Sequence, residues 1–268
     1  MKTSVAINKG QLELLKFVAK YRFVTSYHVQ KQFDYKSRNS VNNKLKRLVD
    51  AGFLGMKYDN AKKLSGIPAS YYLTPLGLRE VQQQLTYITD AIIKNAYGDK
   101  NASESLIQES AELFELAQSL TTTYPNLKAL TARQLGDLEY FPRPLPDLYL
   151  AHKQEEETYR FFLYQFRDVK RYDVAVNSAI ARLIKYREAE TYAESGNEFP
   201  IVLFVCATAT IERHAQRVMK SALNKSYEPI LVYTTSFQAL SQQKNIDQAI
   251  WSSIEYPDTL LTLEEVES

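Results

Sequence analysis

Hydrophobic residues at helical spacing mark three short helices near the start of the chain. The spacing predicts helices over residues 11–20, 26–33 and 37–51, the last closed by Gly52. Two strand-like runs, FLGMKYD and SYYLT, then flank the loop NAKKLSGIPA, and PLGLREV opens a further helix with Pro75 in its first turn. The pattern therefore predicts three helices, a two-stranded hairpin and a fourth helix.

The third predicted helix has two faces of different character. Val41, Leu45, Leu48 and Val49 fall at helical spacing and are expected to pack inward. The opposite face then carries amides and cations side by side: Arg38, Asn39, Asn42, Asn43, Lys46 and Arg47. In the major groove Asn can pair with an adenine edge, and Arg or Lys with a guanine edge. This face is a candidate DNA reader, with a plain solvated helix surface as the alternative.

The charge of the chain is divided unevenly along its length. Residues 1–80 contain 15 Lys and Arg against five Asp and Glu, whereas the remainder contains 18 basic and 26 acidic residues. A basic segment of this size can supply the counterion-releasing part of nucleic-acid affinity. The two regions are therefore expected to face different partners.

The order of elements and the exit YYLTPLGLREV resemble the winged-helix DNA-binding superfamily over about residues 8–85. The resemblance implies that the third helix enters the major groove of double-stranded DNA. It also implies that cations of the wing, namely Lys57, Lys62 and Lys63, approach the phosphates or the minor groove. Some winged helices serve protein contacts only, so that use stays open.

Two apolar stripes follow the hairpin and predict a helical linker over residues 86–125. The first predicts one long helix that carries Leu78, Val81, Leu85, Ile88 and Ile92. The second lies on a helix at about 103–122 with Leu106, Leu113 and Leu120. Packing between these helices and a homodimer interface both fit the stripes. The run NAYGDKNAS between them is expected to be a turn-rich connector and a hinge.

The second half of the chain, residues 126–268, has a strand-rich pattern. DLYLAHK and YRFFLYQFR predict strands joined by the acidic turn QEEET, followed by a helix over 174–194, a strand over 199–208, a helix over 210–223 and the strand PILVYTT. This order predicts a three-layer α/β domain with a mixed sheet. The uniformly apolar strand at 199–208 is expected to be its buried centre.

The same order, with RPLPD before the first strand, resembles the PD-(D/E)XK nuclease-like fold, also called restriction-endonuclease-like. Asp147 matches the first acidic residue of that family, but Gln165 and Arg167 stand where the family places an acid and a lysine. Mg²⁺ prefers carboxylate oxygens, so this departure indicates a non-catalytic domain. If the domain were active, Glu139 or Asp168 would have to complete the site.

A winged helix before a degenerate nuclease-like domain also resembles the replication-relaxation family. The features that carry the resemblance are YYLTPLG, LPDLYL, the aromatic strand and LIKYREA. It implies a non-catalytic DNA-binding accessory protein of plasmid replication or conjugative mobilisation, with a relaxase or a replication initiator as candidate partner. The alternatives are a transcriptional regulator with an α/β effector domain and a metal-dependent nuclease with a shifted active site.

Other chemistry finds little support in the sequence. The start has no signal-peptide pattern and the most apolar run, PIVLFVCA, is too short to cross a bilayer, so a cytoplasmic location without membrane contact is expected. The single cysteine, Cys206, excludes an intramolecular disulfide. Phosphate-binding and dinucleotide-binding glycine loops are absent, and the three histidines lack metal spacing. We expect no metal and no cofactor.

Overall fold

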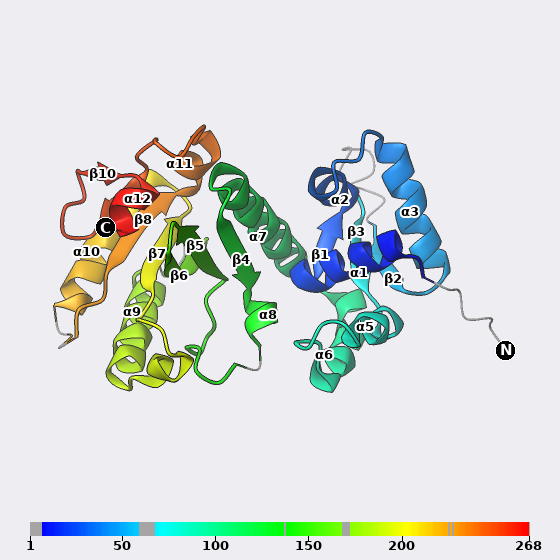
Figure 1. Ribbon diagram of the computed structural model, residues 1–268, viewed down its shortest axis with the longest axis horizontal. Coiled ribbons are helices and arrows are strands. Elements are labelled where there is room, and N and C mark those ends of the chain that lie inside the picture. Colours follow the sequence, from blue (N-terminus) through cyan, green and yellow to red (C-terminus); the bar gives the residue numbers. More distant parts are fainter. Residues whose placement is uncertain are drawn as a thin grey trace. The chain divides into compact units, whose positions relative to one another are not determined.

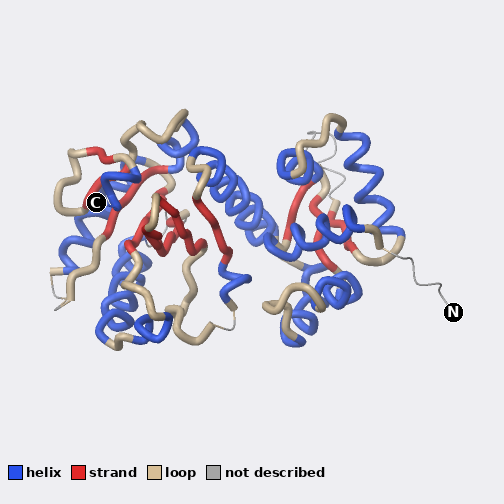
Figure 2. The backbone as a smooth tube through the Cα atoms, in the orientation of Figure 1, coloured by secondary structure: helices blue, strands red, loops and turns tan. Residues whose placement is uncertain are grey.

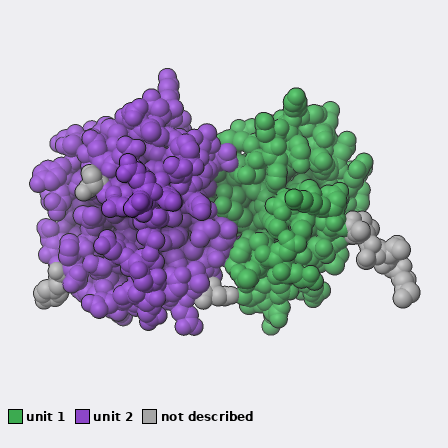
Figure 3. Space-filling model, viewed as in Figure 1, with its two compact units in different colours: residues 1–115 green, residues 116–268 purple. Residues whose placement is uncertain are grey.

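The computed structural model describes residues 7–58, 68–136, 138–167, 172–224, 226 and 228–267. The chain forms two compact units, residues 1–115 and 116–268 (Figure 3). The boundary between them falls inside the helix α7 (Glu104–Thr123). No helix of the described ranges is both long and apolar enough to span a bilayer.

Unit 1 consists of three helices, a small sheet and further helices (Figure 1). The three predicted helices are present as α1 (Lys9–Tyr21), α2 (Ser26–Gln32) and α3 (Arg38–Asp50). The two predicted strands are β2 (Leu54–Lys57) and β3 (Ser70–Leu73), which pair antiparallel. A third strand, β1 (Phe23–Thr25), pairs with the other side of β3 and was not predicted, since three residues carry too short an alternation.

The end of α3 is fastened to the start of α5 (Pro75–Gln82). Gly52 has a φ of 82°, the left-handed conformation that ends α3 as predicted. The hydroxyl of Thr74 donates to the Gly52 carbonyl at 2.6 Å and caps α5 by accepting from the Gly77 amide at 3.2 Å. A Cβ at Gly77 would lie 2.2 Å from the carbonyl oxygen of Phe53, so only glycine permits this approach.

The single long helix predicted from the first apolar stripe is wrong. Helix α5 ends at Gln82, and a new helix, α6 (Asp90–Asn95), begins after Thr89, whose hydroxyl accepts from the Ile92 amide. The stripe was misleading because Leu78, Val81 and Ile88 are buried in the unit without lying on one helix. The spacing of these apolar residues reflects their burial in the core of unit 1 and does not require one continuous helix.

The run NAYGDKNAS contains regular structure and a partly buried ion pair, and its role as a hinge stays a prediction. It contains the 3₁₀ helix η1 (Ala96–Asn101), and Asp99 within it is 3% exposed. Arg22 donates to one carboxylate oxygen of Asp99 from Nη2 at 2.7 Å and from Nε at 3.1 Å. These two hydrogen bonds hold the segment against α1, because moving it away would leave the buried carboxylate of Asp99 without its cation.

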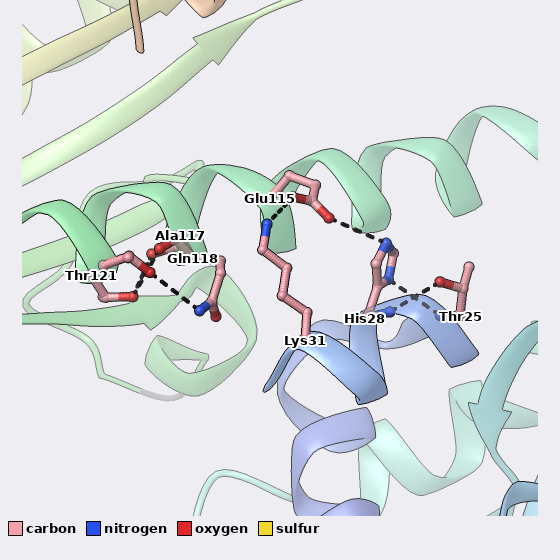
Figure 4. A network of polar contacts seen from close by, with 8 residues as sticks. Thr25, His28, Lys31, Glu115, Ala117, Gln118 and Thr121 are labelled. Carbon is pink, nitrogen blue, oxygen red and sulfur yellow. Dashed lines mark hydrogen bonds and ion pairs between the residues drawn. The ribbon is translucent and has the colours of Figure 1, made fainter. Parts of the chain in front are cut away.

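A polar network around His28 joins α2 to α7 (Figure 4). Nδ1 of His28 accepts from the Thr25 amide at 3.2 Å, while the Thr25 hydroxyl accepts from the His28 amide at 3.3 Å, a reciprocal cap of α2. Nε2 faces Glu115 at 3.8 Å, and Lys31 pairs with Glu115 at 2.6 Å. Because Nδ1 accepts, the imidazole is neutral and carries its proton on Nε2.

Unit 2 is built on a seven-stranded mixed sheet in the order β10-β9-β8-β7-β6-β5-β4 (Figures 1 and 2). The predicted strands are present as β5 (Leu148–Gln154), β6 (Glu157–Phe166), β7 (Ile201–Cys206) and β8 (Val232–Ser236). The sheet continues through β4 (Leu127–Thr131), β9 (Trp251–Ser253) and β10 (Leu260–Leu261), which were not predicted. Strands β6, β7 and β8 are parallel and their outer neighbours antiparallel, so the mixed sheet is confirmed.

Helices cover both faces of this sheet. On one face, α9 (Tyr172–Glu188) and α10 (Ala209–Leu223) pack on a core that includes Phe162 and Phe204. On the other, α12 (Leu263–Glu267) reaches β5, where Glu267 bonds Nδ1 of buried His152 at 2.8 Å. The short helices α8 (Ala132–Leu135), η2 (Thr191–Ser195) and α11 (Phe237–Gln242) complete the unit.

Two details of the predicted unit are settled by the structure. Residues 202–206 of β7 are all fully buried, as expected of the central strand. The helix predicted over 174–194 instead ends at Glu188, because Glu190 takes a left-handed conformation with a φ of 50°. The turn lets Tyr192 enter the core, where its hydroxyl lies 3.0 Å from that of Tyr149.

The buried position of His28 generates a prediction about pH. Burial lowers the pKa of His28 to about 4, an effect that Glu115 opposes and Lys31 adds to. Between pH 6.5 and 4 the unfolded chain therefore binds a proton that the folded chain does not, and stability is lost as the pH falls. We expect the free energy of unfolding to drop by ~2 kcal/mol from pH 7 to pH 5 on this account.

His28→Gln isolates this contribution, because glutamine can accept from the Thr25 amide but does not titrate. Urea denaturation followed by far-UV circular dichroism should give wild-type and variant curves that diverge with pH. Parallel pH profiles for the two proteins would contradict the assignment.

Candidate functional site

The outer face of α3 is the first candidate site. Val41, Leu45 and Leu48 are at most 1% exposed and hold the helix against unit 1. All six predicted reading residues are exposed: Arg38, Asn39, Asn42, Asn43, Lys46 and Arg47. All six lie on one helix and are open to solvent, and their role in reading DNA stays a prediction.

An acid also belongs to this face. Asp50, the last residue of α3, is exposed and falls on the side opposite the buried residues by helical spacing. Cations and amides occupy the rest of the face toward the N-terminus of the helix. A polyanion laid along the face is therefore attracted over most of its length and repelled at one end.

Of the three lysines predicted for the wing, the structure describes only Lys57. Lys57, at the end of β2, is partly buried and donates from Nζ to the carbonyl of Ala102. Lys62 and Lys63 lie outside the described residues. The proposed phosphate contacts of the wing therefore stay a prediction.

The second candidate site lies where β5 and β6 separate in unit 2. Strand β5 begins at Leu148, which pairs with Leu163, so the later residues of β6 lack a β5 partner. Oδ2 of Asp147 accepts a hydrogen bond from the backbone amide of Gln165 at 2.7 Å. This bond replaces the one that a neighbouring strand residue would otherwise make with that amide. Burial, and after it the charge of Asp147, raises the pKa of the neighbouring Tyr164 phenol.

Gln165 and Arg167 interact directly with one another. Oε1 of Gln165 accepts from Nε of Arg167 at 3.0 Å and also from its Nη2. The amide oxygen is thereby committed to a guanidinium. Nε2 of the same amide is buried and has no hydrogen-bond partner among the described residues.

These residues do not fit the metal site of the resembled fold. A Mg²⁺ ion needs several oxygen ligands, and here one carboxylate oxygen holds a backbone amide while the glutamine oxygen holds a cation. Glu139 is exposed and does not line the cleft beside Asp147, and Asp168 is outside the described residues. No group of three or more His, Cys, Asp or Glu placed to hold a metal occurs in the described part of the chain.

Sequence reasoning missed two cations beside this site. Arg143 and Arg182 line the same cleft as Asp147 and Gln165, the first from the loop before β5 and the second from α9. Arg143 belongs to the RPLPD run, so its position was available from the sequence. Arg182 gives no such signal, because only the packing of α9 on the sheet brings it there.

Comparisons with known proteins give a sparse result. No protein-family model matches the chain, and no curated protein matches it. Among solved structures it is similar to the restriction endonuclease FokI, with a TM-score of 0.37 and 12% identity over 96% of this chain. FokI bound to DNA gives a TM-score of 0.27 and 10% identity over 86% of this chain.

The chain spans 45% and 43% of the length of these two FokI chains. A likeness at this level carries neither a fold nor an activity from one protein to the other.

The bond between Asp147 and the Gln165 amide leads to a prediction about stability. Asp147→Ala leaves a strand amide without an acceptor and should lower the free energy of unfolding by about 1–3 kcal/mol. Asp147→Asn keeps a side-chain oxygen and should lower it less. Urea denaturation followed by the fluorescence of Trp251, the single tryptophan and a buried residue of unit 2, measures both.

Added Mg²⁺ should leave the denaturation midpoint of wild type and both variants unchanged. A midpoint that rises with Mg²⁺ in the wild type but not in Asp147→Ala would show that Asp147 is a metal ligand after all.

Proposed function

We propose that the chain is a DNA-binding protein in which unit 1 is a winged helix and α3 reads the sequence of double-stranded DNA. The observation that carries the proposal is the surface of α3: six amide and cationic side chains are exposed on a helix whose three apolar side chains are buried. The three-helix and hairpin order of unit 1 supports it.

The chemistry of this face suits both parts of DNA recognition. The major groove admits an α-helix, and asparagine can donate to and accept from an adenine edge at once. Lys46 and Arg47 can pair with guanine or with phosphates. The basic excess of residues 1–80 adds a sequence-independent attraction that weakens with salt.

For the role in the cell, we propose a non-catalytic accessory protein of a mobile element, active in plasmid replication or conjugative mobilisation. The proposal rests on the resemblance to the replication-relaxation family and on the departure of Gln165 and Arg167 from a nuclease site. In this proposal unit 2 is a restriction-endonuclease-like scaffold that contacts a relaxase, a replication initiator or further DNA. The protein is also a candidate homodimer.

The cleft beside Asp147 favours a second candidate function, a transcriptional regulator whose α/β unit binds an effector. The cleft is partly apolar and carries a few polar groups, a combination typical of small-molecule sites. Both candidates share the reading helix and differ in what unit 2 binds.

The asparagines of α3 provide a test of sequence reading. Asn42→Ala or Asn43→Ala in the full chain should cost about 1–3 kcal/mol on a site selected from a random DNA pool, and little on random duplex. Fluorescence anisotropy measures both affinities. Asn95→Ala, an exposed asparagine at the end of α6, is the matched control. Equal losses on selected and random DNA would exclude α3 as the reader.

The charges of α3 provide a test with opposite signs. Lys46→Gln should weaken binding to every duplex and reduce the slope of log affinity against log salt by about 0.9. Asp50→Asn should strengthen binding to every duplex, a gain that misfolding cannot produce. Lys94→Gln on α6 is the control with an exposed lysine elsewhere. If Asp50→Asn leaves affinity unchanged or lowers it, DNA does not lie along this face.

A further inference from the structure

The cleft beside Asp147 is large enough for a small ligand. It has a volume of about 490 Å³ and lies between the loop before β5, the end of β6 and α9. Ligand pockets in proteins commonly measure about 300–1,000 Å³. The residues that line it fall into three chemical groups.

The first group is cationic. Arg143 and Arg182 both line the cleft and are exposed. Arg143 uses Nη2 to hold the Gly136 carbonyl at 2.9 Å, which positions its guanidinium and leaves other N–H groups for a ligand. A guanidinium matches the oxygens of a phosphate better than an ammonium does. Asp147 is the acid among the described lining residues, so cations are in excess.

The second group is apolar. Pro142, Pro144, Phe166 and Leu183 line the cleft, and Phe166 stacks on Phe204 with ring centroids 4.9 Å apart and planes 11° from parallel. This stacking fixes the ring and gives the cleft a rigid wall. A flat heteroaromatic ring gains free energy by lying on such surfaces.

The third group is polar. Oδ2 of Asp147 accepts from the backbone amide of Gln165, and each carboxylate oxygen can accept more than one hydrogen bond. Gln165 has the buried Nε2 donor that no described residue satisfies. An unsatisfied buried donor is costly and is tolerated mainly at functional sites. A nucleobase edge carries both donors and acceptors, so it can pair with a carboxylate and an amide together.

We propose that this cleft binds a single nucleotide unit without a metal ion. The phosphate lies at Arg143 and Arg182, the base packs against Pro144 and Phe166, and the base edge meets Asp147 and Gln165. The proposal concerns unit 2 alone and does not depend on DNA reading by α3.

Two sources supply this chemistry: a free mononucleotide or one nucleotide of a single strand. The test titrates the full chain by calorimetry at low salt with EDTA, using dAMP, dGMP, dCMP, TMP, inorganic phosphate and a 5′-phosphorylated eight-nucleotide strand. Binding of at least one mononucleotide or of the strand is expected, and more tightly than inorganic phosphate. Preference for mononucleotides identifies the first source, and preference for the strand identifies the second.

Variants assign the binding to the cleft. Arg182→Gln should weaken it about tenfold, whereas Arg217→Gln, an exposed arginine of α10 outside the cleft, should leave it unchanged. Asp147→Asn should alter which base binds most tightly, because the amide replaces one acceptor by a donor.

Several results would overturn the proposal. They are absence of binding by every nucleotide probe, equal losses in Arg182→Gln and Arg217→Gln, or inorganic phosphate binding as tightly as the nucleotides. Binding that requires Mg²⁺ in place of EDTA would equally exclude a metal-free site. Asn43→Ala should not affect the titrations with mononucleotides, so failure of mononucleotide binding and failure of DNA reading by α3 are separate results.

Discussion

The burial of three apolar side chains on one side of α3 is the constraint on which the functional account depends. Val41, Leu45 and Leu48 fix the rotation of the helix, so the residues between them have to face solvent. The turn at Gly52 and the close approach at Gly77 then fix its C-terminal end. A helix held in this way has little backbone freedom left to lose on binding.

A comparable constraint operates at the end of a strand in unit 2. Because β5 begins at Leu148, no β5 residue pairs with Gln165, and the side chain of Asp147 accepts from the backbone amide of Gln165 instead. The carboxylate that resembles a metal ligand therefore completes the sheet, and Arg167 occupies the glutamine oxygen beside it. The positive charges around this point suit an anion better than a divalent cation. The cleft beside Asp147 is therefore better suited to an anionic ligand than to a metal ion.

Sequence patterns predicted the elements whose periodicity was long and clear. Helix α3 and the buried strand β7 are examples, since each has enough residues for one burial pattern to dominate. The patterns failed where burial came from tertiary packing, as in the stripe that α5 and α6 share, or where strands such as β1 were too short. For the sites, helical spacing was enough to group the α3 residues. Arg182 could not be placed, because its proximity to Asp147 depends on how α9 packs on the sheet.

The most direct test of the central claim places a DNA-cleaving probe on α3. The single native cysteine, Cys206, is fully buried, so an iron–EDTA reagent will attach selectively at an introduced Asn43→Cys or, as control, Asn95→Cys. On a DNA site selected with the full chain, the probe at position 43 should cut within a few nucleotides, and the probe at position 95 should cut diffusely or not at all. Diffuse cutting from position 43, or focused cutting from position 95 alone, would contradict the claim that α3 lies against the DNA.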